Sequence, residues 1–126
     1  MKHRTLGPLR YSEHKGLHRV DAPWSITLGL AWSERAFRLA DDGNVVLANL
    51  NQDGTLSVSP GYLWDGSSGP TIDGAADPVP SLVHDVLYEA MRSRRLGAEH
   101  RAAADALYRE LLRERGMNWF RRWGRW

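Results

Sequence analysis

The sequence predicts an α+β fold, in which a small antiparallel sheet in the N-terminal half is followed by an antiparallel helix pair and a short terminal helix. Apolar runs with β-branched residues, separated by Asp-Gly pairs, occupy residues 24–58, and such pairs are typical of hairpin turns. Apolar residues then recur at helical spacing over residues 77–115. With 126 residues, 42% of them hydrophobic, we expect a single domain over residues 1–126. It is mainly β over residues 1–64 and mainly α over residues 77–126, with a glycine-rich loop over residues 65–76.

The β half contains several strand-like runs. Residues 17–20 are expected to form one short strand. The runs 24–32, 36–39, 45–50 and 56–58 predict an antiparallel meander of three or four strands, with turns at Asp42-Gly43 and Asp53-Gly54. Leu56 and Val58 alternate with hydroxyl residues, so they are expected to face the core.

Two helices follow the loop. Asp77 is expected to cap the first helix, with Pro78 in its first turn; this helix runs to about residue 95 and stops at Gly97. The second helix is predicted over residues 98–115, with Gly116 as its C-cap. The short connection favours an antiparallel pair.

The C-terminus carries Trp119, Trp123 and Trp126 with arginines between them. One interpretation is a short amphipathic helix that seeks a lipid interface or a nucleic acid. The favoured interpretation is a terminal helix whose tryptophans dock onto the rest of the domain, because a chain of this size needs its aromatic residues for the core.

Charge is distributed unevenly along the chain. Residues 41–91 contain eight acidic residues and no Lys or Arg, whereas residues 92–126 contain ten arginines and four acidic residues. An acidic region attracts cations and a basic one attracts anions, although solvated faces also differ in charge without any ligand. The chain has no cysteine, so oxygen or imidazole ligands must hold any metal. Neither a signal peptide nor a membrane span is expected.

The segment Ser81–Tyr88 places a base, an acid and a phenol together. At i and i+4 on a helix, His84 and Tyr88 share one face. We predict that Asp105 on the second helix meets His84, together with Asp85, and that Asp65 is a fourth candidate. His84 would act as a general base, Asp105 would fix its tautomer, and Tyr88 would bind the same carboxylate. Asp85 and Asp65 would bind a hard cation.

The same residues also permit a structural interpretation, in which they form a hydrogen-bond network that caps helices and anchors the loop. Tyr108 lies on the same helix face as Asp105 and is a candidate binding residue. The glycine-rich segment 61–74, which includes Gly66, either brings backbone groups close to a ligand or simply connects the sheet to the helices.

Three motifs occur in order along residues 36–126: Pro60-Gly61-Tyr62 with Asp65, Ser68 and Pro70, then His84-Asp85-Val86-Leu87-Tyr88, then Ala104-Asp105 and Gly116. These motifs resemble those of a family of small phage and prophage proteins, the domain of unknown function 1353. The chain departs from the family pattern at Trp64, Ser67 and Tyr108, where the family has Thr, Ala and Phe. The resemblance implies a phage or prophage origin and a shared polar site, whose residues are Asp65, Ser68, His84, Asp85 and Asp105.

A second, local resemblance concerns His84, Asp85, Tyr88 and Asp105, which are similar to the active-site helix pair of calcium-dependent secreted phospholipases. It implies that His84 activates water, Asp85 binds calcium, and Tyr88 and Asp105 support the histidine. Those enzymes are rich in disulfides and have a different calcium loop, so convergence on a short motif is the alternative.

Together these features lead to a first hypothesis: a metal-assisted hydrolase of phage origin that acts on lipid or cell-envelope ester or amide bonds, with calcium favoured over zinc. The alternative is a virion or assembly protein that binds other phage structural proteins and uses the His-Asp cluster only for stability. Nucleic-acid binding is the least favoured, because no recognised motif is present. The expected location is the host cytoplasm or the virion.

Overall fold

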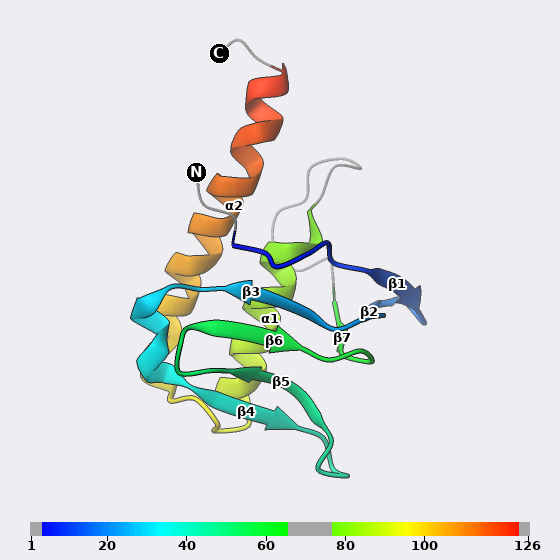
Figure 1. Ribbon diagram of the computed structural model, residues 1–126, viewed down its shortest axis with the longest axis vertical. Helices are drawn as coiled ribbons and strands as arrows, with labels where there is room; N and C mark the ends of the chain where they lie inside the picture. Colours follow the sequence, from blue (N-terminus) through cyan, green and yellow to red (C-terminus); the bar gives the residue numbers. More distant parts are fainter. Residues whose placement is uncertain (1–3, 66–76, 124–126) are drawn as a thin grey trace.

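The computed structural model describes the backbone of residues 4–65 and 77–123, and the side chains of residues 4–65 and 77–115. In these described residues, seven antiparallel strands precede two α-helices (Figure 1), which confirms the predicted α+β class. The elements in chain order are β1 (Tyr11–His14), β2 (Leu17–Val20), β3 (Trp24–Thr27), the 3-10 helix η1 (Leu30–Arg35), β4 (Phe37–Ala40), β5 (Val46–Leu50), β6 (Thr55–Val58), β7 (Leu63–Trp64), α1 (Pro78–Arg92), the 3-10 helix η2 (Ala98–His100) and α2 (Arg101–Trp123).

The larger sheet has four strands in the order β3-β6-β5-β4. The predicted meander is right for β4, β5 and β6, but wrong for β3, which pairs with β6 at the opposite edge. The apolar run does not continue as a strand, because Gly29 takes a φ of 110° and the chain then enters η1, which buries Trp32. The connection through η1 carries the chain to the far edge, and the result is a Greek-key strand order.

The smaller sheet has the order β1-β2-β7, and β2 confirms the predicted strand over residues 17–20. Backbone hydrogen bonds join Val20 to the segment before β7: the Val20 N–H donates to the carbonyl of Tyr62, and the Gly61 N–H donates to the carbonyl of Val20. These bonds hold the Tyr62 backbone against β2.

Both predicted hairpin turns form. In the first, the Asp41 carboxylate accepts hydrogen bonds from the backbone N–H groups of Gly43 and Val45, and the positive φ falls on Asn44 rather than on Gly43. In the second, Gly54 has a φ of 84°. Leu56 and Val58 are buried, as their alternation predicts.

The helix starts are predicted better than the helix ends. The Asp77 side chain accepts a hydrogen bond from the Val79 N–H and caps α1, as predicted. The end predicted at Gly97 is wrong: α1 ends at Arg92, the chain turns through Arg94 at a φ of 63°, and Gly97 precedes η2.

The second helix is also longer than predicted. It continues through Gly116 to Trp123, so Gly116 does not end it and no separate terminal helix follows within the described residues. One interior glycine costs a helix about 1 kcal/mol relative to alanine, which a helix of 23 residues tolerates. The tryptophan side chains of the C-terminus lie outside the described side chains, and the docking prediction for them stays a prediction.

The helices pack against each other on one face of the four-stranded sheet and run antiparallel (Figure 1). One continuous apolar cluster joins the sheets to both helices. Its largest fully buried side chains include Trp64, Ile26, Leu50, Leu56, Leu82, Leu87 and Leu111. Because these side chains are buried, only one other face of α1 is left against which α2 can pack. None of the helices in the described part of the chain has the length and hydropathy of a membrane span.

Candidate functional site

His84, Tyr88 and Asp105 form one cluster between α1 and α2. The Nε2 atom of His84 lies 3.1 Å from Oδ1 of Asp105, and the Tyr88 hydroxyl donates a hydrogen bond of 2.6 Å to the same oxygen. The His84 and Tyr88 rings also stack, with centroids 4.3 Å apart. The predicted contact among these three residues is therefore present.

The local sequence explains the cluster. The apolar side chains of α1 turn toward the sheet, and His84 and Tyr88, one helical turn apart, border that buried stripe. Because α2 runs back along α1, it presents Asp105 and Tyr108, three residues apart, to the same border. The Tyr108 ring lies 4.6 Å from the His84 ring, so Tyr108 packs against the histidine and covers one of its sides.

The electrostatics of the cluster favour one arrangement of protons. Hydrogen bonds from Tyr88 and then from His84 hold the pKa of Asp105 below its usual range, so Asp105 is a carboxylate near neutral pH. The same carboxylate raises the pKa of the Tyr88 phenol, which remains a donor. A neutral His84 must then donate through Nε2 and carry its lone pair on Nδ1.

The Nδ1 atom of His84 accepts no hydrogen bond from the described residues. About a quarter of the His84 side chain is exposed, and 38% of Asp105 is exposed. The imidazole is therefore oriented by a carboxylate on one nitrogen and open on the other. This is the arrangement that a general base requires, and it also suits a nitrogen ligand for a metal.

Asp85 does not join this cluster, although the sequence predicted that it would. Its carboxylate accepts a 2.7 Å hydrogen bond from the Tyr62 hydroxyl. The position next to His84 in the sequence turns Asp85 about 100° around the helix axis, away from Asp105 and toward the segment before β7. Asp85 and Tyr62 thus form a second polar pair on another side of α1.

Burial dominates the chemistry of this pair. Burial raises the pKa of Asp85, and the hydrogen bond from Tyr62 and the charge of Arg92 oppose that rise only in part. Burial and the nearby carboxylate likewise raise the pKa of Tyr62, whose side chain is only 4% exposed. Asp85 is therefore the carboxyl group of α1 that binds protons more readily than usual, in contrast to Asp105 on α2.

The predicted cation ligands are placed in part. Asp65 follows β7 directly, and β7 is tied to α1 by a 3.1 Å hydrogen bond from the Trp64 indole to the Ser81 hydroxyl. Gly66 and Ser68 lie outside the described residues. Among the residues that are described, no group of three or more His, Asp or Glu side chains is arranged to hold a metal ion.

Sequence reasoning named Tyr62 only as part of the family motif and missed its contact with Asp85. Tyr62 lies 23 residues from Asp85, in a segment without helical or strand periodicity, so spacing gives no signal for the contact. The only signal is indirect: a buried carboxylate such as Asp85 needs a donor, and Tyr62 is one of few phenols in the chain.

Comparisons with known proteins identify a family. No curated protein and no solved structure matches this chain. The family model described as "Protein of unknown function (DUF1353)" matches residues 44–126. That span begins just before β5, runs to residue 126 and includes Tyr62, His84, Asp85, Tyr88 and Asp105. It covers well over half of the 126 residues, and on this basis the chain belongs to the DUF1353 family of proteins of unknown function.

Proposed function

We propose that this protein is a hydrolase in which His84 is the general base. The observation that carries the proposal is the orientation of His84: Asp105 engages its Nε2 at 3.1 Å, and none of the described residues binds its Nδ1. Tyr88 holds the carboxylate in place through the same oxygen. A base that is fixed on one side and open on the other is the chemical requirement for activating water.

The reaction can be written with these residues alone. His84 Nδ1 takes a proton from a water molecule, and the water oxygen attacks the carbonyl carbon of an ester or amide. The Asp105 carboxylate stabilises the imidazolium that forms. The bond from the carbonyl carbon to the leaving group then breaks, and the leaving group takes the proton from His84. Tyr88 and Tyr108 keep the imidazole in its plane.

A divalent cation is a further part of the proposal, with calcium favoured over zinc because carboxylate and carbonyl oxygens are its preferred ligands. Asp85 and Asp65 are the residues that would hold it, and its chemistry would be to polarise the substrate carbonyl. The described residues alone do not supply three ligating side chains, so no step above depends on the cation.

The proposed substrates are lipids or cell-envelope components with ester or amide bonds. The similarity of the His84 segment to the phospholipase helix pair supports this class, and the family resemblance supports the further proposal of a phage or prophage origin. Such an enzyme would act from the host cytoplasm or from the virion.

The test is hydrolysis of phospholipid vesicles and of purified peptidoglycan by the wild type and His84→Ala. We expect the variant to lose about two orders of magnitude of activity, the usual contribution of a general base. His14→Ala, a histidine on the β1–β2 hairpin, is the matched control and should retain activity. No hydrolysis of either substrate by the wild type, or full activity in His84→Ala, would disprove the proposal. Calorimetric titration with calcium and with zinc, repeated on Asp85→Asn, tests the cation separately.

A second candidate is a non-enzymatic virion or assembly protein. The observation that favours it is that His84, Tyr88 and Tyr108 pack as a continuous set of rings between α1 and α2, which a purely structural network would also require. This candidate predicts that the protein copurifies with phage particles and that Asp105→Ala lowers the melting temperature strongly. Absence from particles would count against it.

A further inference from the structure

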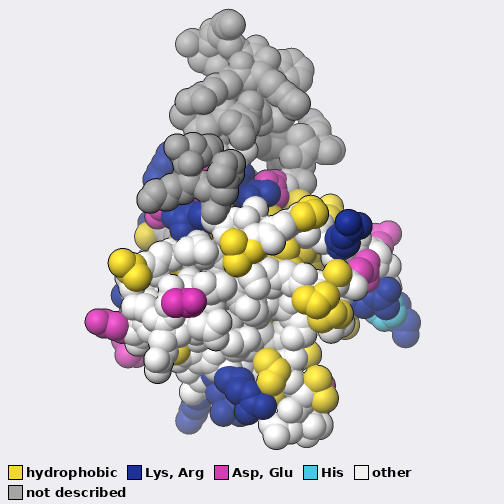
Figure 2. Space-filling model, in the orientation of Figure 1, with side chains coloured by type: hydrophobic (Ala, Val, Ile, Leu, Met, Phe, Trp, Pro, Cys, Tyr) yellow, Lys and Arg dark blue, Asp and Glu magenta, His cyan; other side chains and the backbone are white. Residues whose placement is uncertain are grey.

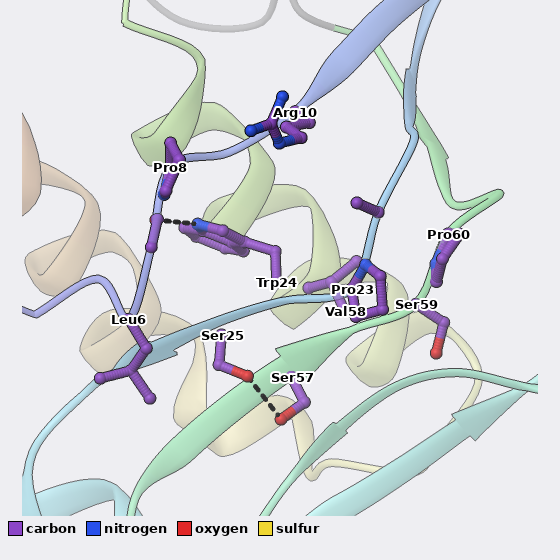
Figure 3. Close-up of a pocket in the computed structure, with 12 residues that line it drawn as sticks. Leu6, Pro8, Arg10, Pro23, Trp24, Ser25, Ser57, Val58, Ser59 and Pro60 are labelled. Carbon is purple, nitrogen blue, oxygen red and sulfur yellow. Dashed lines mark hydrogen bonds between the residues drawn. The ribbon is translucent and has the colours of Figure 1, made fainter.

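A groove lies on the face of the four-stranded sheet that is turned away from α1 and α2. Its volume is about 510 Å³, within the range of small-ligand and short-peptide sites. The described residues that line it come from the N-terminal segment, from the start of β3 and from the end of β6 (Figure 3). None of them belongs to the His84 cluster, so the groove is a separate feature of the molecule.

The walls of the groove are apolar and polar in about equal parts. Leu6 is 66% exposed, and the rings of Pro8, Pro23 and Pro60 surround the opening (Figure 3). Trp24 also lines it, but only 4% of its side chain is exposed and its indole N–H donates to the Gly7 carbonyl at 3.2 Å. Because proline rings are already rigid, a ligand that contacts them loses little binding free energy to the ordering of the protein. The buried Trp24 ring offers no open face on which a sugar would stack.

Hydroxyl groups supply the polar part of the groove. The Ser25 and Ser57 hydroxyls lie 3.0 Å apart and bond to each other across the β3–β6 pair (Figure 3). Only one of their two hydrogens is used in that bond, so one donor and several lone pairs remain. A pair that both donates and accepts matches a peptide backbone, which presents N–H and C=O groups in alternation.

Arg10 supplies the charge. It is the one charged residue among the described residues that line the groove, and the described part of the chain offers it no ion-pair partner. Figure 2 shows that the surrounding face consists mostly of uncharged side chains and backbone. A single guanidinium matches one carboxylate, which it can bind through two parallel hydrogen bonds. A nucleic acid or an anionic membrane would require several cations.

We propose that this groove binds a short extended peptide segment that carries one carboxylate side chain. Arg10 binds the carboxylate, Ser25 and Ser57 bind the peptide backbone, and the proline walls with Leu6 contact the apolar neighbours of the acidic residue. The site is independent of any hydrolysis at His84. It makes the protein a binding module for acidic, apolar peptide segments of a protein partner.

The test uses the full chain labelled with ¹⁵N and a pool of acetylated, amidated pentapeptides with a central glutamate between apolar residues. The matched control pool has glutamine at the centre. We expect the glutamate pool to shift the Trp24 indole N–H resonance and the amide resonances of Ser25 and Ser57, and the glutamine pool to shift them far less. Because a hydrogen bond to a charged group contributes strongly to affinity, Arg10→Gln should weaken binding by roughly tenfold.

Ser57→Ala should weaken binding to a smaller extent, and Arg38→Gln, which removes an exposed arginine from β4, should leave it unchanged. The proposal is overturned if the glutamate pool produces no shifts, if both pools bind equally, or if Arg10→Gln binds as the wild type does. It is also overturned if inorganic phosphate or phosphatidylglycerol vesicles produce the same shifts as the peptides, because the groove would then recognise a general anion or a membrane.

Discussion

The Nε2 atom of His84 and the Oδ1 atom of Asp105 lie 3.1 Å apart across two antiparallel helices, and that oxygen also accepts the Tyr88 hydroxyl at 2.6 Å. One carboxylate oxygen therefore joins α1 to α2 and orients the imidazole. The same contacts keep the pKa of Asp105 below its usual value of 3.8. The stability of the helix pair and the orientation of the His84 ring depend on the ionisation of a single group.

The first expected consequence is acid sensitivity. A carboxyl group whose pKa is lowered by folding stabilises the protein above its unfolded pKa, and this contribution is lost as the pH falls through the folded pKa. Asp105→Asn should therefore be less stable than the wild type at about pH 6. This difference in stability between Asp105→Asn and the wild type should shrink once the pH falls below 3.8, the ordinary pKa of an aspartate side chain. Urea denaturation over this pH range measures it. Glu34→Gln, at an exposed position, is the control, and a pH-independent difference for Asp105→Asn would contradict the mechanism.

The Tyr62–Asp85 pair should respond in the opposite sense. Because burial raises the pKa of Asp85, the folded protein binds this proton more tightly than the unfolded chain, and the resulting stabilisation fades as the pH rises through the folded pKa. At neutral pH, Asp85→Asn removes the cost of a half-buried charge and keeps an acceptor for Tyr62. We expect it to raise the free energy of unfolding.

Tyr62→Phe is the complementary variant. It leaves the Asp85 carboxylate without its donor and should lower the free energy of unfolding by about 1–3 kcal/mol. Thermal and urea denaturation at neutral pH distinguish the two variants. If Asp85→Asn is less stable than the wild type, the carboxylate has a structural role that the hydrogen bond to Tyr62 does not account for.

Arg4 ties the N-terminal segment to the C-terminal helix. Its guanidinium donates to Glu110 at 2.7 Å and to Glu114 at 2.9 Å, and to the backbone carbonyls of Thr27 and Leu28 at 3.1 Å. Only 18% of the side chain is exposed. We expect Arg4→Ala to lower the free energy of unfolding by about 1–3 kcal/mol, because two carbonyls and two carboxylates lose a donor.

The control for Arg4 is Arg38→Ala, which removes an exposed arginine from β4 and should change stability by less than about 0.5 kcal/mol. Arg4→Lys should restore only part of the loss, because an ammonium group cannot reproduce the fork of donors. Equal effects of Arg4→Ala and Arg38→Ala would show that the five hydrogen bonds of the Arg4 guanidinium contribute little.

Alanine substitutions at two glycines with the same φ angle allow the cost of dihedral strain to be distinguished from the cost of steric overlap. Gly54 and Gly16 both have a φ of 84°. A Cβ atom at Gly54 would lie 2.4 Å from the carbonyl oxygen of Gly29, whereas a Cβ atom at Gly16 would meet nothing within 4 Å. Gly16→Ala should therefore cost about 1–2 kcal/mol from the dihedral alone, and Gly54→Ala about 2–4 kcal/mol. If urea denaturation shows the same loss in the free energy of unfolding for both variants, the ends of β3 and β6 separate without cost.

Features that depend on local rules were predictable. The Asp77 cap, the two Asp-Gly hairpins and the inward side of β6 follow from interactions within a few residues. The pairing of His84 and Tyr88 with Asp105 was also accessible, because helical spacing and one short connection restrict how two helices meet. The end of α1, the continuation of α2 through Gly116 and the place of β3 beside β6 were not, because packing of the whole chain outweighs the preference of a single glycine or strand.

The sequence by itself determined the fold class, the order of the sheet and the helices, and the residues that form the His84 cluster, since periodicity sets which side chains share a face. Only the tertiary structure decided the partner of Asp85. Asp85 follows His84 directly, yet it turns away from Asp105 and meets Tyr62, which β2 holds in place through backbone hydrogen bonds from distant parts of the chain. The groove beside Arg10 likewise exists only because the N-terminal segment, β3 and β6 come together in space. Contacts between segments that are far apart in the chain produce no periodic pattern in the sequence, and they form only when the chain folds.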